Sequence, residues 1–253
     1  MRFVLIHGGF HGAWCWDRTI PELERLGHEA IAIDLPGHGE RAHEEPTRAA
    51  RQAALRSIMQ SGDVLVGHSG GGFDITIAAD AAPDLVSHVV YLAAGLPREG
   101  RTIPEAITQR DAPVAQAEAL DEVSGMKQYL AVEGDGMRFA DFGGARAIFY
   151  HDCDEASARW AFEQLTPARA GDNVSTPVSV PRFWSADLPR SFILCLEDRA
   201  QPRWLADLMA KRLGVEALTI DSSHSPFLSQ PAALAELIVH ATTTVPVGAL
   251  IPD

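Results

Sequence analysis

The chain has 253 residues, of which 46% are hydrophobic and 22% charged, a composition typical of a globular protein that buries a sizeable core. Its 34 acidic and 21 basic residues give a formal net charge of -13, which argues against nucleic acid or an anionic membrane as partner. The length suits one α/β domain with an insertion.

Apolar strands alternate with helices along the first hundred residues. The predicted strands cover residues 2–9, 30–39, 63–69 and 88–97, and the predicted helices cover 16–29, 47–59 and 73–86. Thr47 is placed to open the second helix, Gly27 to stop the first and Pro83 to break the third. This alternation predicts an α/β fold whose mostly parallel sheet is covered by helices on both faces.

The same alternation returns near the end of the chain. Strands are predicted at 190–198 and 215–221, and helices at 202–214 and 231–242. Residues 98–187 interrupt it with alanine-rich helical stretches, glycine clusters and a proline-spaced segment. We therefore expect a core of residues 1–97 and 188–253, with residues 98–187 inserted as a cap over the sheet.

Several classes of site and location find no support in the sequence. Cys15, Cys153 and Cys195 are odd in number and lack CxxC spacing, so we expect buried small hydrophobes and neither disulfides nor a zinc site. No metal or dinucleotide motif appears, so no cofactor is expected. Without a signal-peptide pattern or an apolar run of roughly 18–20 residues, the expected location is the cytoplasm, with no membrane partner. The oligomeric state stays open between a monomer and a homodimer.

One glycine-rich stretch, VLVGHSGGGF, follows the third predicted strand and opens a helix. Its residues Gly67-His68-Ser69-Gly70-Gly71 match G-x-S-x-G, the pattern of a nucleophile elbow. The amide of Gly70 then lies at the start of the helix, where it would stabilise an oxyanion. A nucleotide-binding turn is the alternative, but phosphate loops need other glycine spacing or a lysine. Ser69 is therefore the candidate nucleophile.

A serine nucleophile needs a base and an orienting acid, expected in the chain order Ser, Asp or Glu, His. Asp198 ends the strand FILCLED, and His224 follows the strand VEALTID in SSHSPFLSQP. Both therefore lie at the carboxyl ends of strands, on the same edge of the sheet as Ser69. Glu197 and Asp221 are the alternatives for the acid.

The loop after the first strand, HGGFHGAWCW, should supply a second oxyanion donor. Gly9 is the expected donor, with Phe10 as the close alternative. His7 is expected to make structural hydrogen bonds within the loop, whereas His11 is a candidate for facing the substrate. The tryptophans of this loop, Trp14 and Trp16, are expected to pack within the protein rather than to bind substrate.

Aromatic residues of the insertion are candidates for the pocket by position alone. Most of them should instead form the core of the cap, because aromatic side chains chiefly supply buried area. Phe139 and Trp184 join His11 as the predicted substrate contacts. The full set of aromatic candidates is Phe139, Phe142, Phe149, Trp160 and Trp184.

Several motifs together resemble the α/β-hydrolase family, most of all its branch of plant methylesterases, hydroxynitrile lyases and bacterial pyrethroid-type esterases. They are FVLIHGGFHGAWCW, IAIDLPGHG, LVGHSGGG, FYHDCDEASARWAFEQLTP, LCLEDRAQP and SSHSPFLSQP. The resemblance covers nearly the whole chain. It implies an α/β-hydrolase fold, with Ser69 as nucleophile, His224 as base, Asp198 as acid, and the amides of Gly9 and Gly70 as oxyanion hole.

This branch holds lyases as well as esterases. The lyases carry a hydroxyl residue after the first-strand histidine and a lysine after the catalytic histidine, where this chain has Gly8 and Ser225. Both departures favour hydrolysis of a small carboxylic ester, thioester or lactone. The alternatives are a lyase or cofactor-free oxygenase with His224 as base, and a receptor that has lost activity, which the intact triad argues against.

Overall fold

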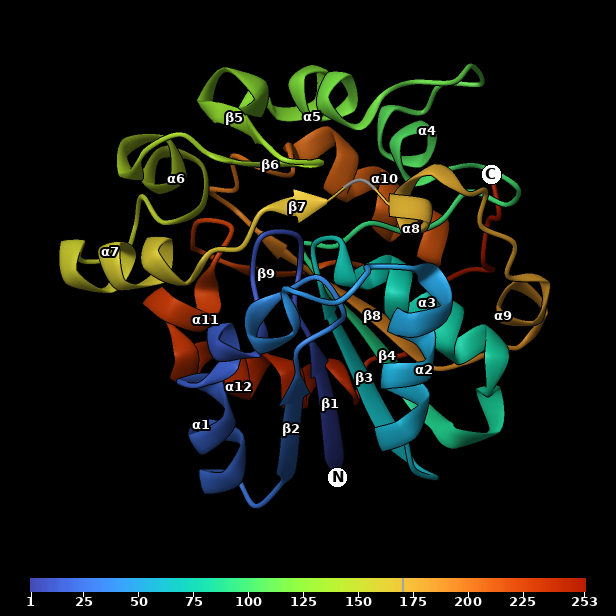
Figure 1. Cartoon of the computed structure of the whole chain (residues 1–253). Coiled ribbons are helices and arrows are strands. Elements are labelled where there is room, and N and C mark those ends of the chain that lie inside the picture. Colours follow the sequence, from blue (N-terminus) through green and yellow to red (C-terminus); the bar gives the residue numbers. More distant parts are fainter. Residues whose placement is uncertain (170) are drawn as a thin grey trace.

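A six-stranded parallel sheet forms the centre of the protein, seen in a computed structural model that describes residues 1–169 and 171–253 (Figure 1). Its strands, in spatial order, are β2 (Glu29–Ile33), β1 (Arg2–Ile6), β3 (Asp63–His68), β4 (Val86–Leu92), β8 (Arg190–Cys195) and β9 (Leu218–Ile220). All neighbouring strands pair in parallel, which confirms the predicted sheet. Most strands end earlier than predicted, because the loops that carry the candidate site begin there.

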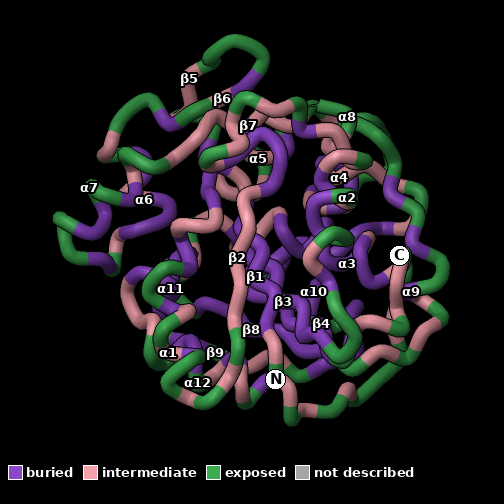
Figure 2. The backbone as a smooth tube through the Cα atoms, turned by 60° about the horizontal axis from the view of Figure 1, so that its bottom comes forward, coloured by how far each residue is buried: buried purple, intermediate pink, exposed green. Residues whose placement is uncertain are grey.

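Helices cover both faces of the sheet. They are α1 (Thr19–Arg25) and α12 (Pro231–Ala241) on one face, and α2 (Arg48–Ile58), α3 (Gly71–Ala81) and α10 (Arg203–Leu213) on the other. Alternate residues of β1 enter the two cores: Phe3 and Leu5 pack under the first pair of helices, Val4 and Ile6 under the other three. The central strands are buried along their length, as Figure 2 shows.

Helix boundaries follow local signals where those signals are strong. The Thr47 hydroxyl accepts a hydrogen bond from the Ala50 amide at 3.1 Å, which confirms it as the cap of α2. α3 ends before Pro83, which opens the short 3-10 helix η3 (Pro83–Leu85). The helix predicted over 16–29 is wrong at both ends: α1 ends at Arg25, and Glu29 already begins β2. A separate 3-10 helix, η1 (Ala13–Trp16), precedes α1, because the carboxylate of Asp34 holds the amide of Ala13 at 2.6 Å.

The chain between β4 and β8 holds short helices and a small second sheet. In Figure 1 most of this insertion lies beyond the carboxyl ends of the central strands. The strands β5, β6 and β7 form an antiparallel sheet that the sequence analysis did not predict. The elements are α4 (Ile103–Thr108), α5 (Gln116–Ser124), η4 (Met126–Tyr129), β5 (Leu130–Glu133), β6 (Gly136–Phe139), α6 (Phe142–Phe149), α7 (Glu155–Gln164), β7 (Ala168–Arg169), α8 (Gly171–Ser175) and α9 (Pro181–Ser185).

The last part of the insertion returns to the sheet. α9 packs against α3, and Val178, Val180 and Phe183 join the core on the α2, α3 and α10 face. Part of the predicted cap, residues 178–183, thus packs with the core. The division of the chain into a core and a cap of residues 98–187 stays a prediction.

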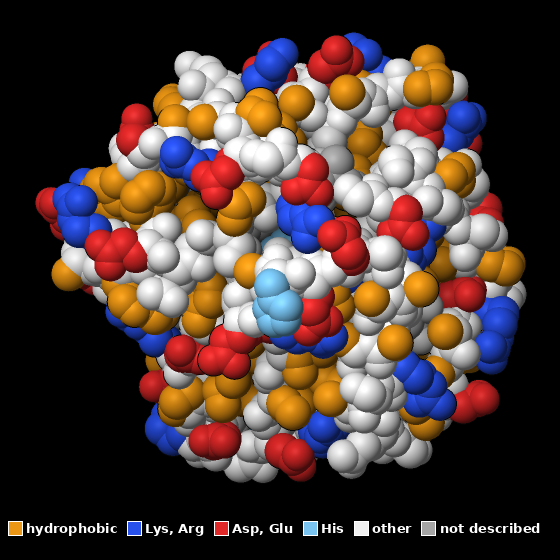
Figure 3. All heavy atoms as spheres, in the orientation of Figure 1, with side chains coloured by type: hydrophobic (Ala, Val, Ile, Leu, Met, Phe, Trp, Pro, Cys, Tyr) orange, Lys and Arg blue, Asp and Glu red, His pale blue; other side chains and the backbone are white. Residues whose placement is uncertain are grey.

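Other sequence predictions concern the thiols and the surface. All three cysteines are free and buried, as predicted. On the face drawn in Figure 3, acidic and basic side chains are interspersed without a continuous basic patch. Among residues 1–169 and 171–253, every helix is too short or too polar to cross a bilayer.

Candidate active site

Ser69 occupies the sharp turn between β3 and α3. Its φ of +52° lies in the left-handed region, which a non-glycine residue adopts at a cost and which recurs at functional sites. The Ser69 amide donates to the carbonyl of Leu92 at 3.1 Å, and the Ser69 carbonyl accepts from the Gly95 amide at 3.0 Å. The turn also requires Gly71, because a Cβ there would lie 2.6 Å from the carbonyl oxygen of His7.

His224 and Asp198 form a buried pair on the loops after β9 and β8. The Nδ1 of His224 donates to Oδ2 of Asp198 at 2.7 Å, and the two side chains are 2% and 4% exposed. The amides of residues 200 and 201 donate to the other carboxylate oxygen at 2.7 and 2.9 Å. Glu197 and Asp221, the alternatives for the acid, are exposed. Asp198 is thus the carboxylate that the fold brings to His224.

His68, the residue before Ser69, supports the loop of His224. Its Nε2 donates to the carbonyl oxygen of His224 at 2.9 Å, and the two rings lie 4.5 Å apart. Burial, followed by the charges of the neighbouring histidines, holds the pKa of His68 well below its usual value, so the ring is neutral. Ser69 and His224 line the same cavity, although the described residues show no hydrogen bond between their side chains. Catalytic hydrogen bonds often form only once substrate is bound.

The backbone amides of Gly9 and Gly70 belong to residues that line the same cavity as Ser69. A Cβ built on Gly70 would lie 3.6 Å from the nitrogen of Gly9, so the two peptides are neighbours. Within the described residues, neither amide donates to another group. Phe10, the alternative donor, has a φ of +66°, and its carbonyl accepts from the amide of Thr166 at 2.8 Å. The site therefore has the free donors that an oxyanion requires.

A cavity of about 160 Å³ lies over these groups. Of the predicted site residues, Ser69, Gly9, Phe10, Gly70 and His224 line it. Apart from His224, its described lining residues carry no ionisable side chain, and none is a lysine or arginine. The sequence analysis missed the wall that α4, α5 and η4 supply, although the i, i+4, i+7 spacing on α5 marks one helical face. This wall consists of Ile103, Pro104, Ile107, Gln116, Leu120, Val123 and Met126.

The prediction that His11 contacts substrate is wrong. His11 is 1% exposed and lies outside the cavity lining. Its Nδ1 donates to the carbonyl of Gly9 at 2.9 Å, and the Tyr150 hydroxyl donates to its Nε2 at 2.8 Å. Burial lowers the pKa of His11 to about 3, so the neutral ring holds this arrangement. His11 therefore supports the loop after β1 that carries Gly9.

The aromatic candidates of the insertion divide between two layers. Phe149 lines the cavity, and its ring stacks on His224 with centroids 5.4 Å apart. Phe139 was predicted to contact substrate but lies one layer behind, its ring 5.3 Å from that of Phe10 and 5.0 Å from that of Phe149. Its place is in the core beneath the cavity wall.

The remaining aromatic candidates lie away from the cavity. The prediction for Trp184 is wrong, because α9 turns back to α3 and the Trp184 indole donates to Glu99 at 2.7 Å. Trp160 packs edge-on against Trp14 with ring centroids 5.3 Å apart, and Phe142 packs edge-on against Phe162 with ring centroids 6.0 Å apart.

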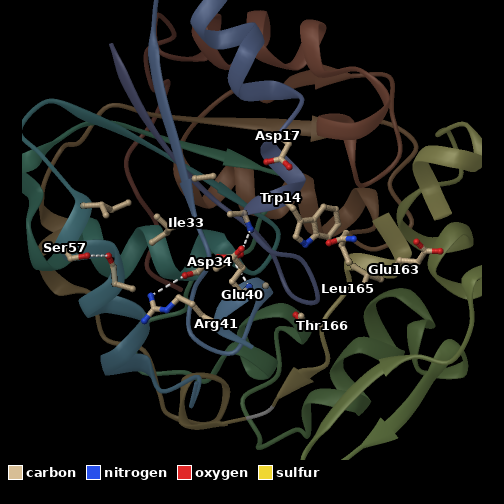
Figure 4. A pocket seen from close by; sticks show the side chains of 16 residues that line it. Trp14, Asp17, Ile33, Asp34, Glu40, Arg41, Ser57, Glu163, Leu165 and Thr166 are labelled. Carbon is tan, nitrogen blue, oxygen red and sulfur yellow. Dashed lines mark hydrogen bonds between the residues drawn. The ribbon is translucent and has the colours of Figure 1, made fainter. Parts of the chain in front are cut away.

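A wider hollow of about 880 Å³ runs between β2 and the end of α7 (Figure 4). Asp34 lies in it, but its two carboxylate oxygens accept from the amides of Ala13 and Glu40. Neither Ser69 nor His224 lines this hollow. Among the residues that the structure describes, no three His, Cys, Asp or Glu side chains gather in a metal-binding arrangement. The smaller cavity is therefore the candidate active site.

A serine, an aspartate and a histidine at the carboxyl ends of parallel strands, in this chain order, are the arrangement of an α/β-hydrolase. Residues 3–237 match the model of the Alpha/beta hydrolase family, and the chain belongs to that family. This confirms the predicted fold class and the resemblance.

Similar proteins come from the branch that the motifs indicated. Methylesterase 1 of Arabidopsis thaliana is 29% identical over 93% of this chain and 93% of its own length. The pyrethroid hydrolase of Sphingobium wenxiniae is 29% identical over 93% of this chain and 85% of its own. Among solved structures, an extracellular alpha/beta-hydrolase from a Paenibacillus species superposes with a TM-score of 0.78 at 23% identity, covering 96% of this chain and all of that one. The chain is thus an ester hydrolase of the α/β-hydrolase type.

Proposed function

We propose that the protein hydrolyses a small, uncharged carboxylic ester through an acyl-enzyme on Ser69. The observation that carries the proposal is the buried His224–Asp198 pair, joined at 2.7 Å, beside a serine held at a φ of +52° in the wall of the same cavity. An acid that orients the base and a serine exposed on a strained turn are the two requirements of acyl transfer by this fold.

The reaction proceeds in two halves. The Oγ of Ser69 attacks the ester carbonyl carbon while Nε2 of His224 takes its proton, and the amides of Gly9 and Gly70 stabilise the oxyanion. The intermediate collapses, and His224 gives the proton to the departing alcohol. Water, deprotonated by His224, then attacks the acyl carbon. The second intermediate collapses to the carboxylic acid as His224 returns that proton to Oγ of Ser69, which restores the free serine and the neutral base. Asp198 keeps the proton on Nδ1 of His224 throughout.

The cavity supports a limit on the substrate. Its volume of about 160 Å³ is close to that of an engineered apolar cavity of about 150 Å³ that binds benzene. One ring or a short alkyl chain therefore fits beside Ser69. With no described lysine or arginine in the wall, a charged acyl group would find no partner. Thioesters and lactones of this size satisfy the same chemistry. The relatives named methylesterase and pyrethroid hydrolase support an ester substrate.

Three measurements test the proposal. First, p-nitrophenyl esters of rising acyl length should give a burst of p-nitrophenol, with turnover falling once the acyl group exceeds one ring. Second, a fluorophosphonate should label the peptide that contains Ser69. Third, Ser69→Ala should lose both labelling and several powers of ten in kcat, whereas Ser185→Ala, at an exposed hydroxyl bonded only within α9, should lose neither. Retention of more than a few per cent of activity by Ser69→Ala would favour direct attack by water.

A further inference from the structure

Four consecutive residues of the insertion, Phe149–Asp152, lie where α6 ends and contact three of the loops that carry the candidate site. In Figure 1, this end of α6 is close to the loops that follow β8 and β9. We call residues 149–152 the junction segment.

The first contact, through Tyr150, reaches the loop after β1 that carries Gly9, which we call the oxyanion loop. The Tyr150 hydroxyl donates to Nε2 of His11 at 2.8 Å, and Nδ1 of His11 donates to the carbonyl oxygen of Gly9 at 2.9 Å. A carbonyl oxygen only accepts, so the proton of the neutral ring is on Nδ1 and Nε2 must accept from tyrosine. Tyr150 is fully buried and His11 nearly so. The two bonds therefore hold the Gly9–Phe10 peptide, which is joined through Cα of Gly9 to the peptide that carries the free Gly9 amide.

The second contact reaches the loop of His224 on two sides. The hydroxyl of Ser223 donates to the carbonyl of Phe149 at 2.8 Å, and the Phe149 ring stacks on the His224 imidazole. The carboxylate of Asp152 accepts from the Ser223 amide at 2.9 Å and from the Ser229 hydroxyl at 2.8 Å. The residues before and after the base are thus tied to the junction segment.

The third contact reaches the loop of the acid. The Nε2 of His151 donates to the carbonyl oxygen of Glu197 at 2.9 Å, one residue before Asp198. This bond is exposed and worth less than the buried ones. Together the contacts connect the oxyanion loop, the base loop and the acid loop, which lie far apart in the sequence, to one four-residue segment.

We propose that the junction segment sets the catalytic geometry by holding these three loops in register, with Tyr150 acting through His11 as a positioning residue for the oxyanion hole. The inference rests on the proposed function. It makes the insertion part of the machinery that stabilises the transition state as well as a wall of the pocket. Small displacements matter here, because oxyanion donors act only at distances of about 2.7–3.1 Å.

The test removes one hydroxyl. Tyr150→Phe should lower kcat for a p-nitrophenyl ester about tenfold, less than the 10²–10³ lost with an oxyanion donor itself, and leave KM nearly unchanged. A trifluoromethyl ketone forms an oxyanion when Oγ of Ser69 adds to its carbonyl. The affinity of Tyr150→Phe for this ketone should fall by the same factor as kcat, whereas its affinity for the product acid should not fall. Tyr129→Phe removes a hydroxyl of the same insertion that makes no hydrogen bond within the described residues, and should change none of these.

A double-mutant cycle tests the path. His11→Asn keeps an N–H in the position of Nδ1 and removes the acceptor for Tyr150. Tyr150→Phe should then have no further effect in this background, because the path is already broken. Additive effects would overturn the inference, as would an unchanged kcat in Tyr150→Phe, or a fall in product-acid affinity as large as that in kcat. If Tyr150→Phe fails to fold, the kcat and ketone affinity of His11→Asn decide alone.

The base-loop contact has its own pair of variants. Asp152→Ala should lower kcat, and Asp152→Asn, which keeps an accepting oxygen, should restore most of it. Equal losses in the two variants would contradict positioning by this hydrogen bond. Failure of the proposed function itself would look different, since the unaltered protein would then show neither ester turnover nor labelling at Ser69.

Discussion

The imidazole Nδ1 of His224 lies 2.7 Å from a carboxylate oxygen of Asp198, and both side chains are almost completely buried. The contact joins two loops that leave neighbouring strands, β9 and β8. The second carboxylate oxygen accepts from two backbone amides, so the carboxylate cannot rotate without losing hydrogen bonds. This fixes the tautomer of His224, because the nitrogen that faces a carboxylate must carry the proton.

Asp198→Asn should therefore reduce kcat by about 10⁴ while the protein stays folded. An asparagine that keeps its oxygen toward the two amides presents its NH₂ to His224, and the imidazole then turns its unprotonated nitrogen toward it, which puts a proton on Nε2. Steady-state kinetics, with thermal unfolding as a check on the fold, measure the effect. Glu197→Gln, at the exposed neighbour, is the matched control, and a comparable loss there would contradict the assignment of the acid.

Gly8→Ala should inactivate the enzyme by crowding. A Cβ at residue 8 would lie 2.7 Å from Cβ of Ser69 and 3.1 Å from Nδ1 of His68, so the serine or the loop must move. We expect a loss of at least 10²-fold in kcat, since a displacement of about 1 Å costs that much, and a lower free energy of unfolding by about 1–3 kcal/mol. Gly248→Ala, whose Cβ would meet only Cα of Gly214 at 3.7 Å, should be nearly neutral. Full activity in Gly8→Ala would show that the serine does not occupy its observed position during turnover.

The protein should hydrolyse esters without releasing cyanide from mandelonitrile or acetone cyanohydrin. A lyase needs a cation beside the departing cyanide, and electrostatic effects in such a site amount to several kcal/mol. Ser225 is buried and uncharged, so it supplies no such cation. Lys127 and Arg138 are the cations of the insertion that would be candidates for this role, and neither lines the cavity. Arg138 pairs with Glu133 in the second sheet. Cyanide release faster than hydrolysis of p-nitrophenyl acetate under matched conditions would show that the enzyme is a lyase.

Acid should destabilise the fold through its buried histidines, and His88 lets this be measured away from the site. Burial lowers the pKa of His88 to about 4, against about 6.5 in an unfolded chain. Between these values the unfolded chain binds more protons, so stability falls as the pH falls from 6.5 to 4. His88→Gln should make this slope shallower by up to about 1.4 kcal/mol per pH unit. Urea unfolding at several pH values gives the slopes, and parallel slopes for the two proteins would disprove the assignment.

The features that local chemistry encodes were predictable from the sequence. A glycine-flanked serine between a strand and a helix, and the placement of Asp198 and His224 after later strands, depend on hydrogen bonding and hydrophobic periodicity within a few residues. Parallel strands put their carboxyl ends on one edge, so these groups had to lie on the same side of the sheet.

Tertiary packing decided the rest. Asp198 rather than its exposed neighbour Glu197 meets His224, and Trp184 donates to Glu99 instead of lining the cavity, because the loops and α9 are directed by contacts with distant segments. The hydrogen bond between Tyr150 and His11 joins residues 139 positions apart. No local pattern specifies such a pair, since its energy is gained only after the insertion has folded onto the sheet. The sequence alone therefore determined the candidate catalytic groups and the edge on which they lie, whereas long-range packing determined how they are held and which side chains surround the substrate.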